Sequence, residues 1–508
     1  RDELYTKLFR IFSYAMHQNN TDLGNTEFIA MKGEAQSLLA DLSAKFAFKA
    51  GDILNLGEAA VSGYLQSEPG LKPYQFEFES ILRAGKHILP HGQEEIIRSS
   101  DLFSNNFSTA AGILNNLEMP APEITLADGT KMLLNRANYS KVRESKIRAD
   151  RELAFKVLWG NINQFLNTFA ALLDGEIKKH LFLARARKFP DCLESTLSDD
   201  NIDPSVYHSL IKNGRANLGP LHRYWELKKK LLGVDVLKQS DRFVSAADRV
   251  EKRYSYKEAQ NIILEAFRPL GPEYTQAVRK AFRERWIDLY PNKGKQPGGY
   301  SASAFGLHPY IKLNFDGSYG ALSDLAHELG HAMHSHFSCT SQPFANAECP
   351  TFLAEIASTF NENLLIQYLL KTEKDDLFKL YILDNYLDGF RGTLFRQTLF
   401  AEFELAMHNR VEEGQTLTAD WLNQKYLELT RQYYGHDRGV MDVEDYIQYE
   451  WSGIPHFYYN YYVFQYSTGI ISAISFATAT ALYPILMVAT TVISFPSCRM
   501  AALPKGTV

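Results

Sequence analysis

The sequence predicts a large, mainly α-helical protein with a small β-sheet. Apolar residues recur at three- and four-residue spacing along most of the chain, for example in 38–48, which is the pattern of an amphipathic helix. Short alternating runs typical of strands occur at only two places. The 508 residues are 45% hydrophobic and 22% charged, which is ordinary globular composition. This excludes disordered, collagen-like and coiled-coil proteins.

The first 60 residues have the helical pattern, and residues 101–120, with their Asn, Ser and Pro, resemble a loop region. A small β-hairpin is expected next, because Asp128-Gly129 separates two short alternating runs. These elements define an N-terminal helical region, residues 1–135, which ends in the hairpin.

The remainder, residues 136–508, begins with a helical stretch from Tyr139 to Lys188 and stays helical over 205–290. A turn-rich linker follows Pro291, and Tyr300–Phe305 and Tyr310–Phe315 are then expected to be two strands. After them the pattern is helical again. The predicted sheet therefore lies directly before the most informative segment of the chain.

Charge and cysteine content narrow the function classes. The net charge of −5 gives no electrostatic basis for binding nucleic acid. The four cysteines form no CxxC pair, which argues against a cysteine zinc site and a disulfide framework and favours a reducing, cytoplasmic location. The chain starts at Arg1 with no visible signal peptide, and we expect a preceding segment to be missing.

The segment Leu325–His336 contains the pattern HExxH. Because residues i and i+4 lie on one face of a helix, His327 and His331 can present two imidazoles to one metal ion. Neutral imidazole suits zinc, and three protein ligands with one open position make a catalytic site. Glu328 follows the first histidine and could reach a water molecule at the metal. The alternative is a chance match of a short pattern in a long chain.

The third ligand is expected to be Glu355, which lies on the next helix, 24 residues after His331. It stands among apolar residues, where an acid is costly unless it is paired or bound to metal. A turn at Gln342-Pro343 would return this helix against the first. The alternative is an acid at a helix boundary that faces solvent. Glu362, two turns further along the same face, is a candidate hydrogen-bond partner for a ligand histidine.

A second cluster follows Ile454. Six of the eleven residues from His456 to Tyr466 are histidine or tyrosine, and both side chains can donate hydrogen bonds to a developing oxyanion. An aromatic core helix is the plainer interpretation and fits most of these tyrosines. We favour a functional role for His456, while each tyrosine is evenly balanced between the two interpretations.

Three motifs in this order resemble the oligoendopeptidase F family of thimet-oligopeptidase-like (M3) metallopeptidases: His327–Ser335, Phe352–Thr359 and Ile454–Asn460. The resemblance runs from near Arg1 to about Ser472. It implies an endopeptidase that acts on short peptides and holds one Zn²⁺ per chain. It also implies a mostly helical, two-lobed body with a deep channel that excludes folded proteins.

The resemblance assigns roles residue by residue. The family's metal ligands correspond to His327, His331 and Glu355, and its general base corresponds to Glu328. Its transition-state histidine corresponds to His456. The accompanying tyrosine corresponds to Tyr466 or, because the spacing differs among relatives, to Tyr459 or Tyr462.

The family's substrate-pairing strand corresponds to Tyr310–Phe315, ahead of the zinc helix. The residues that would contact the peptide backbone are Tyr310, Ile311, Lys312, Leu313 and Asn314. The expected partners are therefore oligopeptides, and residues 136–508 are the expected catalytic domain. The resemblance predicts no particular oligomeric state.

The chain departs from the family at both ends. It lacks the expected N-terminal segment, and after about residue 472 the sequence is atypical. No charged residue occurs from Trp451 to Cys498, and Ile470–Phe495 is apolar. That segment could span a bilayer by length, although a buried helix or an altered reading frame is favoured. Two alternatives to an active peptidase follow: a catalytically impaired peptide-binding protein on the same scaffold, and a membrane-anchored protein.

Overall fold

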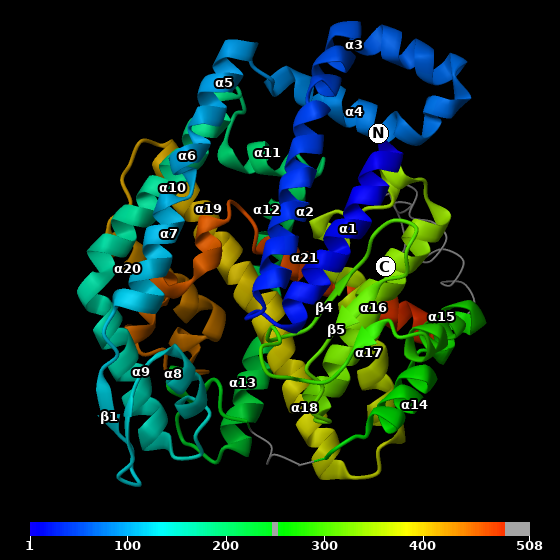
Figure 1. Ribbon diagram of the computed structural model, residues 1–508. Helices are drawn as coiled ribbons and strands as arrows, with labels where there is room; N and C mark the ends of the chain where they lie inside the picture. Colours follow the sequence, from blue (N-terminus) through cyan, green and yellow to red (C-terminus); the bar gives the residue numbers. More distant parts are fainter. Residues whose placement is uncertain (246–251, 483–508) are drawn as a thin grey trace. The chain divides into compact units, whose positions relative to one another are not determined.

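The computed structural model describes residues 1–245 and 252–482 (Figure 1). The chain forms two compact units, and each is assembled from separate stretches of sequence. Among the described residues, unit 1 comprises 1–86, 252–374 and 469–482, and unit 2 comprises 87–245 and 375–468. The division into 1–135 and 136–508 concerns regions along the sequence and stays a prediction.

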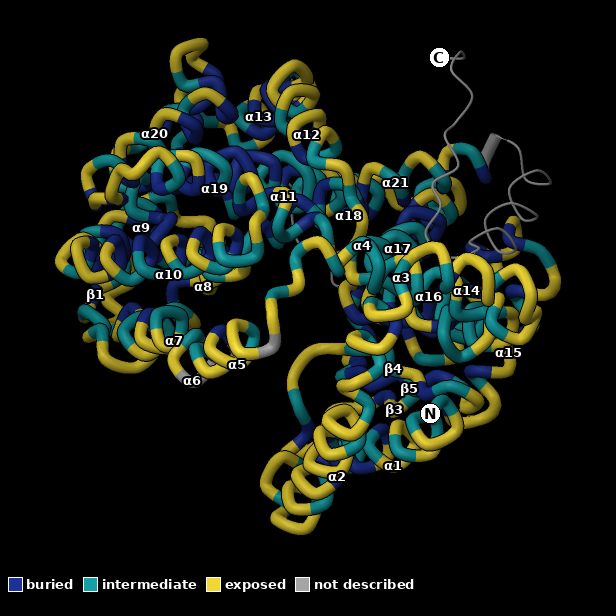
Figure 2. The backbone as a smooth tube through the Cα atoms, turned by 90° about the horizontal axis from the view of Figure 1, so that it is seen from above, coloured by how far each residue is buried: buried dark blue, intermediate teal, exposed yellow. Residues whose placement is uncertain are grey.

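Unit 1 begins with helices, as predicted for the first 60 residues. These are α1 (Asp2–Thr21), α2 (Thr26–Lys45), α3 (Phe48–Ser67), η1 (Pro69–Tyr74), α4 (Gln75–Ala84) and η2 (Gly85–His87). The side chain of Asn25 caps α2 by accepting the backbone N–H groups of Glu27 and Phe28, which satisfies two donors that the helix itself leaves free. Helix α2 packs on α1 and exposes most of its remaining surface (Figure 2).

The rest of unit 1 carries the sheet and the motif helix. Its elements are α14 (Tyr256–Ala266), η6 (Arg268–Leu270), α15 (Gly271–Arg283), β3 (Ile287–Asp288), β4 (Tyr300–Ala302), β5 (Tyr310–Lys312), α16 (Tyr319–Ser341), η7 (Phe344–Asn346), α17 (Thr351–Thr372) and the part of α21 (Phe464–Leu482) that begins at Gly469. Helix α16 packs against β4 and β5. The predicted fold class, mainly α with a small sheet beside the HExxH helix, is confirmed.

The sheet of unit 1 has three strands in the order β3-β5-β4. Strand β5 runs parallel to β3, with Ile311 opposite Ile287, and antiparallel to β4, with Ser301 opposite Ile311. Both predicted strands are therefore present, and the second is the central strand. No strand of the described chain pairs with the other edge of β4.

The regular elements of the described part of unit 2 are helices, apart from one hairpin and an isolated β-bridge between Lys238 and Asp442. Its first stretch contains α5 (His91–Ser99), α6 (Asp101–Ser104), α7 (Asn106–Ile113), η3 (Leu114–Glu118), β1 (Glu123–Thr125), β2 (Lys131–Leu133), α8 (Arg136–Val142), α9 (Arg148–Ile162), η4 (Asn163–Phe165), α10 (Leu166–Ala186), α11 (Cys192–Leu197), α12 (Pro204–Ala216), α13 (Gly219–Leu231) and η5 (Gln239–Asp241). Its second stretch contains α18 (Asp376–Phe390), η8 (Arg391–Phe395), α19 (Arg396–Glu412), α20 (Ala419–Tyr434), η9 (His436–Arg438), η10 (Asp445–Gly453), η11 (Pro455–Tyr458) and the start of α21.

Two predictions in this region have different outcomes. The hairpin is confirmed, with β1 antiparallel to β2 and Gly129 in the left-handed region at φ 86°. The expected loop at 101–120 is wrong, because α6, α7 and η3 occupy most of it. The reason is tertiary packing, which overrides weak local propensity. The ring of Phe107 on α7 lies so close to Gly175 on α10 that a Cβ at Gly175 would be 2.5 Å from it.

A network of buried charges ties the second stretch of unit 2 to the first. Glu450 on η10 is 3% exposed. It accepts hydrogen bonds from Arg242 at 3.0 Å, from Arg396 at 3.0 Å and from the Tyr426 hydroxyl at 2.5 Å. A buried carboxylate requires such partners, because its desolvation is costly.

No helix within residues 1–245 and 252–482 is long and apolar enough to cross a membrane. The described part of the apolar segment Ile470–Phe495 belongs to helix α21, which ends at Leu482. Residues 483–495 lie outside the described residues, so the interpretation of the segment as a whole stays a prediction.

Candidate metal centre

Helices α16 and α17 form the scaffold of the candidate metal centre. The Ser318 side chain accepts the N–H of Ala321 and fixes the start of α16. Helix α17 returns against α16 after the turn predicted at Gln342-Pro343. The two helices are in close contact at Gly330, where a Cβ would lie 2.5 Å from the carbonyl oxygen of Ala357. This position therefore requires glycine.

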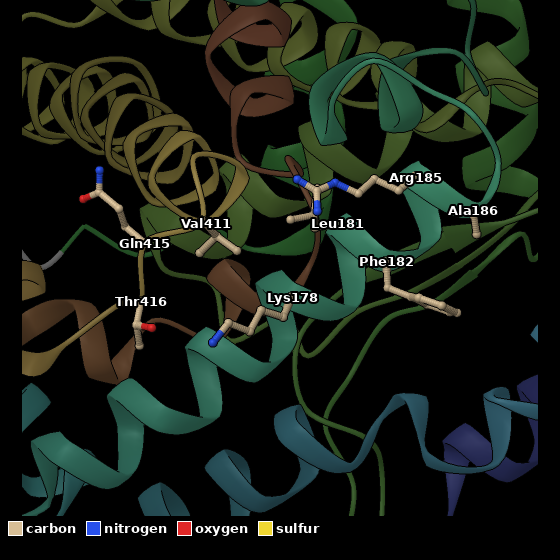
Figure 3. Close-up of a pocket in the computed structure, with 9 residues that line it drawn as sticks. Lys178, Leu181, Phe182, Arg185, Ala186, Val411, Gln415 and Thr416 are labelled. Atoms are coloured by element: carbon tan, nitrogen blue, oxygen red, sulfur yellow. The ribbon is translucent and has the colours of Figure 1, made fainter.

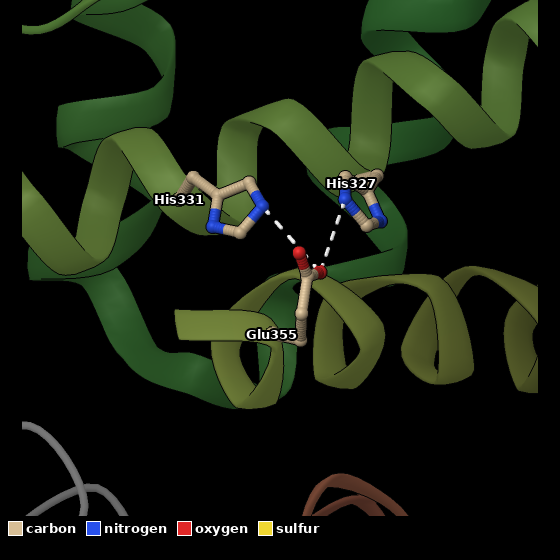
Figure 4. A group of neighbouring side chains, drawn as sticks. All are labelled: His327, His331 and Glu355. Carbon is tan, nitrogen blue, oxygen red and sulfur yellow. Dashed lines mark ion pairs between the residues drawn. The ribbon is translucent and has the colours of Figure 1, made fainter. Parts of the chain in front are cut away.

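The crossing brings together the three predicted ligands (Figure 4). One ligand atom from each of His327, His331 and Glu355 lies within 4.8 Å of the other two. Oε2 of Glu355 is 3.4 Å from Nε2 of His327 and 3.6 Å from Nε2 of His331. Two imidazole nitrogens and one carboxylate oxygen thus face a common point, which is the arrangement expected of three ligands to one metal ion.

Glu362 lies behind this group, on the far side of His327. Its Oε1 is 2.8 Å from Nδ1 of His327, so the ring is held with Nε2 toward Glu355. Burial alone would lower the pKa of His327, but the hydrogen bond and charge of Glu362 outweigh it and raise the pKa to about 9. Burial and the adjacent His327 lower the pKa of His331 to about 4.

Glu328 is buried, with 7% exposure, and follows the first histidine on α16. Its Oε2 has no hydrogen-bond partner within the described residues. Burial raises the pKa of its carboxyl group to about 7. Such a carboxyl group can take up and release a proton near neutral pH. The backbone at Gly299, the residue before β4, lies close by, since a Cβ there would be 3.1 Å from Oε1 of Glu328.

The expected helix through His456 and the tyrosines is wrong as one continuous element. His456 lies in the short η11, and α21 begins only at Phe464. Between them Tyr461 has a left-handed backbone at φ 55°, which interrupts a helix. The ring of His456 lies 5.5, 5.9 and 6.0 Å from those of Tyr459, Tyr462 and Tyr466 respectively.

The three candidate tyrosines therefore surround the candidate histidine. All four residues belong to unit 2, whereas the three predicted ligands belong to unit 1. Their roles at the metal stay predictions.

The expected substrate strand needs a correction, because residues 310–314 have no free edge. Residues 310–312 pair with β4 on one side, while Ile311 and Leu313 donate their N–H groups to Trp286 and Asp288 on the other. The Lys312 ammonium donates to three carbonyl oxygens of residues 296–298, and the Asn314 amide donates to two of them. A peptide cannot add to this strand.

Sequence reasoning missed two residues of the centre. Ser358 has its Oγ 2.8 Å from Oε2 of Glu355. Asn361 donates to the carbonyl of Ala326 on α16 at 3.3 Å and accepts the Tyr274 hydroxyl at 3.0 Å. Both are completely buried. The available signal was a polar residue on the same side of an apolar helix as Glu355, but serine and asparagine in helices are common without such a role.

A cavity of about 620 Å³ opens elsewhere, in unit 2, between α10 and the loop after α19 (Figure 3). Its lining includes Lys178, Phe182, Arg185 and Gln415. Lys178 is already paired with Asp174 at 2.5 Å, and none of the predicted site residues lines this cavity. This cavity is therefore separate from the predicted site residues.

Comparison with known proteins gives a consistent result. The family model described as "Peptidase family M3" matches residues 142–483, and the one described as "Oligopeptidase F" matches 52–120. The chain is 36% identical to oligopeptidase PepF of Bacillus subtilis, over 93% of this chain and 70% of that protein. It is 38% identical to the group B oligopeptidase PepB of Streptococcus agalactiae, over 93% of this chain and 78% of that one.

Solved structures agree with these relatives. The oligoendopeptidase F of Enterococcus faecium superposes with a TM-score of 0.72 at 35% identity, over 96% of this chain and 82% of that one. A proposed peptidase from Chlamydophila abortus superposes with a TM-score of 0.90 at 33% identity, over 97% of this chain and 82% of that one.

Proposed function

Since the chain belongs to peptidase family M3, we propose that it is a zinc-dependent endopeptidase that hydrolyses internal bonds of short oligopeptides. One observation carries the proposal. Three potential ligand atoms, from His327, His331 and Glu355, converge within 4.8 Å, and the buried Glu328 is adjacent to the first of them in the sequence.

The donor set fits zinc. Zinc prefers histidine nitrogen and carboxylate oxygen, and three protein ligands leave one position open for substrate or water. The contact between Glu362 and Nδ1 of His327 matches the carboxylate–histidine pairs that orient metal ligands. The three side chains retain 22–42% exposure, so an ion can reach them. We therefore assign one zinc ion per chain to this group.

Zinc in this position would polarise the scissile carbonyl and make a water molecule more acidic. Glu328 would accept the proton of the attacking water and deliver it to the leaving amine. Burial raises the pKa of Glu328, which is the direction that makes a carboxylate a better proton acceptor. The proposed role of His456, with Tyr466, Tyr459 or Tyr462, is to donate hydrogen bonds to the oxyanion.

The substrate backbone is proposed to pair with β4 (Tyr300–Ala302). This strand has an open edge among the described strands, and its neighbour Gly299 lies beside Glu328. Addition of an extended peptide to a strand edge relies on main-chain hydrogen bonds and tolerates many side chains. The low cysteine content supports a cytoplasmic location for the enzyme.

The decisive experiment measures zinc content together with cleavage of an internally quenched fluorescent peptide. The purified chain should contain one zinc per molecule, lose cleavage on chelation and regain it when zinc is added back. A peptide-binding protein without catalysis would bind the peptide and leave it intact, with or without zinc. That result would refute the proposal.

A further inference from the structure

The side chain of Ser358 contacts the proposed third ligand, Glu355, at one oxygen of its carboxylate. Its Oγ is 2.8 Å from Oε2 of Glu355, the oxygen that faces both imidazoles. Ser358 is completely buried, whereas the Glu355 side chain is 42% exposed. The buried hydroxyl of Ser358 therefore bonds to a carboxylate that could otherwise turn toward solvent.

The hydroxyl has two possible acceptors. Besides Oε2, its Oγ lies 3.0 Å from the backbone carbonyl oxygen of Glu355, the common contact of a helical serine with its own preceding turn. A serine hydroxyl has one proton, and both neighbours are acceptors. The carboxylate contact is shorter, and hydrogen bonds to carboxylates are the stronger ones. The proton is therefore assigned to Oε2.

The position of Ser358 is fixed relative to the two histidines. A Cβ at Gly330 would lie 2.6 Å from Cα of Ser358, so Ser358 sits at the point where α17 touches α16. Gly330 immediately precedes His331. One turn further along α17, Asn361 donates across to the carbonyl of Ala326, which immediately precedes His327. Contacts with α16, the helix that carries both imidazoles, thus fix the position of the Ser358 hydroxyl.

We propose that Ser358 is a positioning residue that holds the Glu355 carboxylate toward His327 and His331 before a metal ion binds. The inference rests on the proposed function, because it requires Glu355 to be a ligand. Without the hydroxyl, Glu355 would sample orientations toward solvent, and zinc binding would have to select the productive one. Partners of metal ligands typically contribute about 10–100-fold in metal affinity, and we expect about tenfold for Ser358→Ala.

The test titrates zinc into metal-free protein in competition with a chromophoric chelator. Thr359→Ala is the matched control, because Oγ1 of Thr359 donates to the backbone carbonyl of Glu355 and not to its carboxylate. Ser358→Ala should bind zinc about tenfold more weakly, whereas Thr359→Ala should stay within about twofold of the parent. With saturating zinc, kcat of Ser358→Ala should return close to the parent value, since the ligand itself remains.

Thermal unfolding of the metal-free proteins separates positioning from a general structural role. The midpoint of metal-free Ser358→Ala should equal that of the parent, and only the increase produced by zinc should be smaller. Unchanged zinc affinity would overturn the inference. So would loss of the metal-free fold in Ser358→Ala, because the hydroxyl would then support the helix pair itself.

A third variant, Glu355→Ala, separates failure of the proposed metal site from failure of the positioning role of Ser358. If it binds zinc as tightly as the parent, Glu355 is not a ligand and the proposed site is wrong. If it loses zinc while Ser358→Ala does not, the site stands and the positioning role of Ser358 fails.

Discussion

The carboxylate of Glu328 is buried, and its Oε2 accepts no hydrogen bond from the described residues. Glu328→Gln keeps the size of the side chain and removes its ability to accept a proton. We expect zinc content near the parent value and kcat reduced by about 10²–10⁴-fold, measured by metal analysis and peptide cleavage. Glu34→Gln, the same change at an exposed position on α2, is the control and should remain active. A Glu328→Gln variant with more than about a tenth of parental kcat would exclude Glu328 as the base.

Glu362 touches His327 through the nitrogen that faces away from Glu355. Glu362→Ala should therefore weaken zinc binding by about 10–100-fold and leave all three ligands in place. Isothermal titration of the metal-free protein measures the effect, with Glu355→Ala as the benchmark for loss of a ligand. Parental affinity in Glu362→Ala would mean that this carboxylate does not orient His327.

Candidate site residues could be predicted from the sequence where the residue type suits a metal ligand and the spacing suits one face of a helix. His327 and His331 are one helical turn apart, and Glu355 is conspicuous because an acid is rare in an apolar stripe. Ser358 could not be inferred in the same way. A buried serine costs little and often bonds to its own helix, so its contact with Oε2 is evident only in the folded structure.

Between elements, the contact of α16 with α17 depends on the absence of one side chain. Gly330→Ala would place a methyl group 2.5 Å from the Ala357 carbonyl oxygen and 2.6 Å from Cα of Ser358. The helices must separate, at a cost of about 1–3 kcal/mol in unfolding free energy, and Glu355 moves away from the histidines. Urea unfolding and zinc titration should therefore both show a loss.

The control for this change is Gly63→Ala in α3, where a Cβ would meet nothing within 4 Å. It should leave zinc binding unchanged and stabilise its helix by about 0.5–1 kcal/mol. Equal effects of the two changes would show that the close crossing does not matter.

Burial raises the pKa of Glu450, but Arg396 and Arg242 outweigh this and lower it to about 2. A depressed carboxyl pKa adds stability above its unfolded value of 4.5, and this stability is lost as the pH falls from 4.5 toward 2. The shift corresponds to about 3 kcal/mol. Glu450→Gln should be less stable at neutral pH by about 3–5 kcal/mol, because two arginines lose their partner, and should show a flatter stability curve below pH 4.5.

Urea unfolding over a pH series measures both effects. The exposed pair of Glu123 with Lys131, 3.7 Å apart, supplies the control, since Glu123→Gln should change little. If the unfolding free energies of Glu450→Gln and the parent changed in parallel with pH, the Glu450 network would not contribute to the loss of stability in acid.

Strand identity was predictable, but strand order was not. Alternation and turn residues indicated two of the three strands of the sheet, whereas the place of Tyr310–Lys312 between two partners depends on β3, a strand of two residues. The same limit applies to 101–120, where contact of Phe107 with α10 decides the structure. Long-range packing, which no local pattern contains, accounts for both errors.

For the whole molecule, the proposed pairing with β4 sets a limit on the substrate. Main-chain hydrogen bonding to a strand edge needs an extended segment, which a folded domain does not offer. We expect cleavage of peptides of roughly 6–20 residues with broad sequence tolerance, a length range that the family resemblance implies. Mass spectrometry of a peptide-length series should show cleavage within this range.

The matched comparison is one small protein in its native form and in its reduced, alkylated and unfolded form. Only the unfolded form should be cut. Rapid internal cuts in the native form would contradict selection by an extended backbone.

The division of unit 1 into separate stretches has a consequence for how the protein is made. Gly469, the first residue of the last stretch, lies against Glu355, but the 94 residues of unit 2 from Asp375 to Thr468 separate it from Lys374. At a synthesis rate of about 5–20 residues per second, the ribosome needs about 5–20 s to cross that gap. Helices α16 and α17 therefore leave the ribosome well before Gly469, and during this interval the nascent chain already contains His327, His331 and Glu355 while the neighbour of Glu355 at Gly469 has yet to be made.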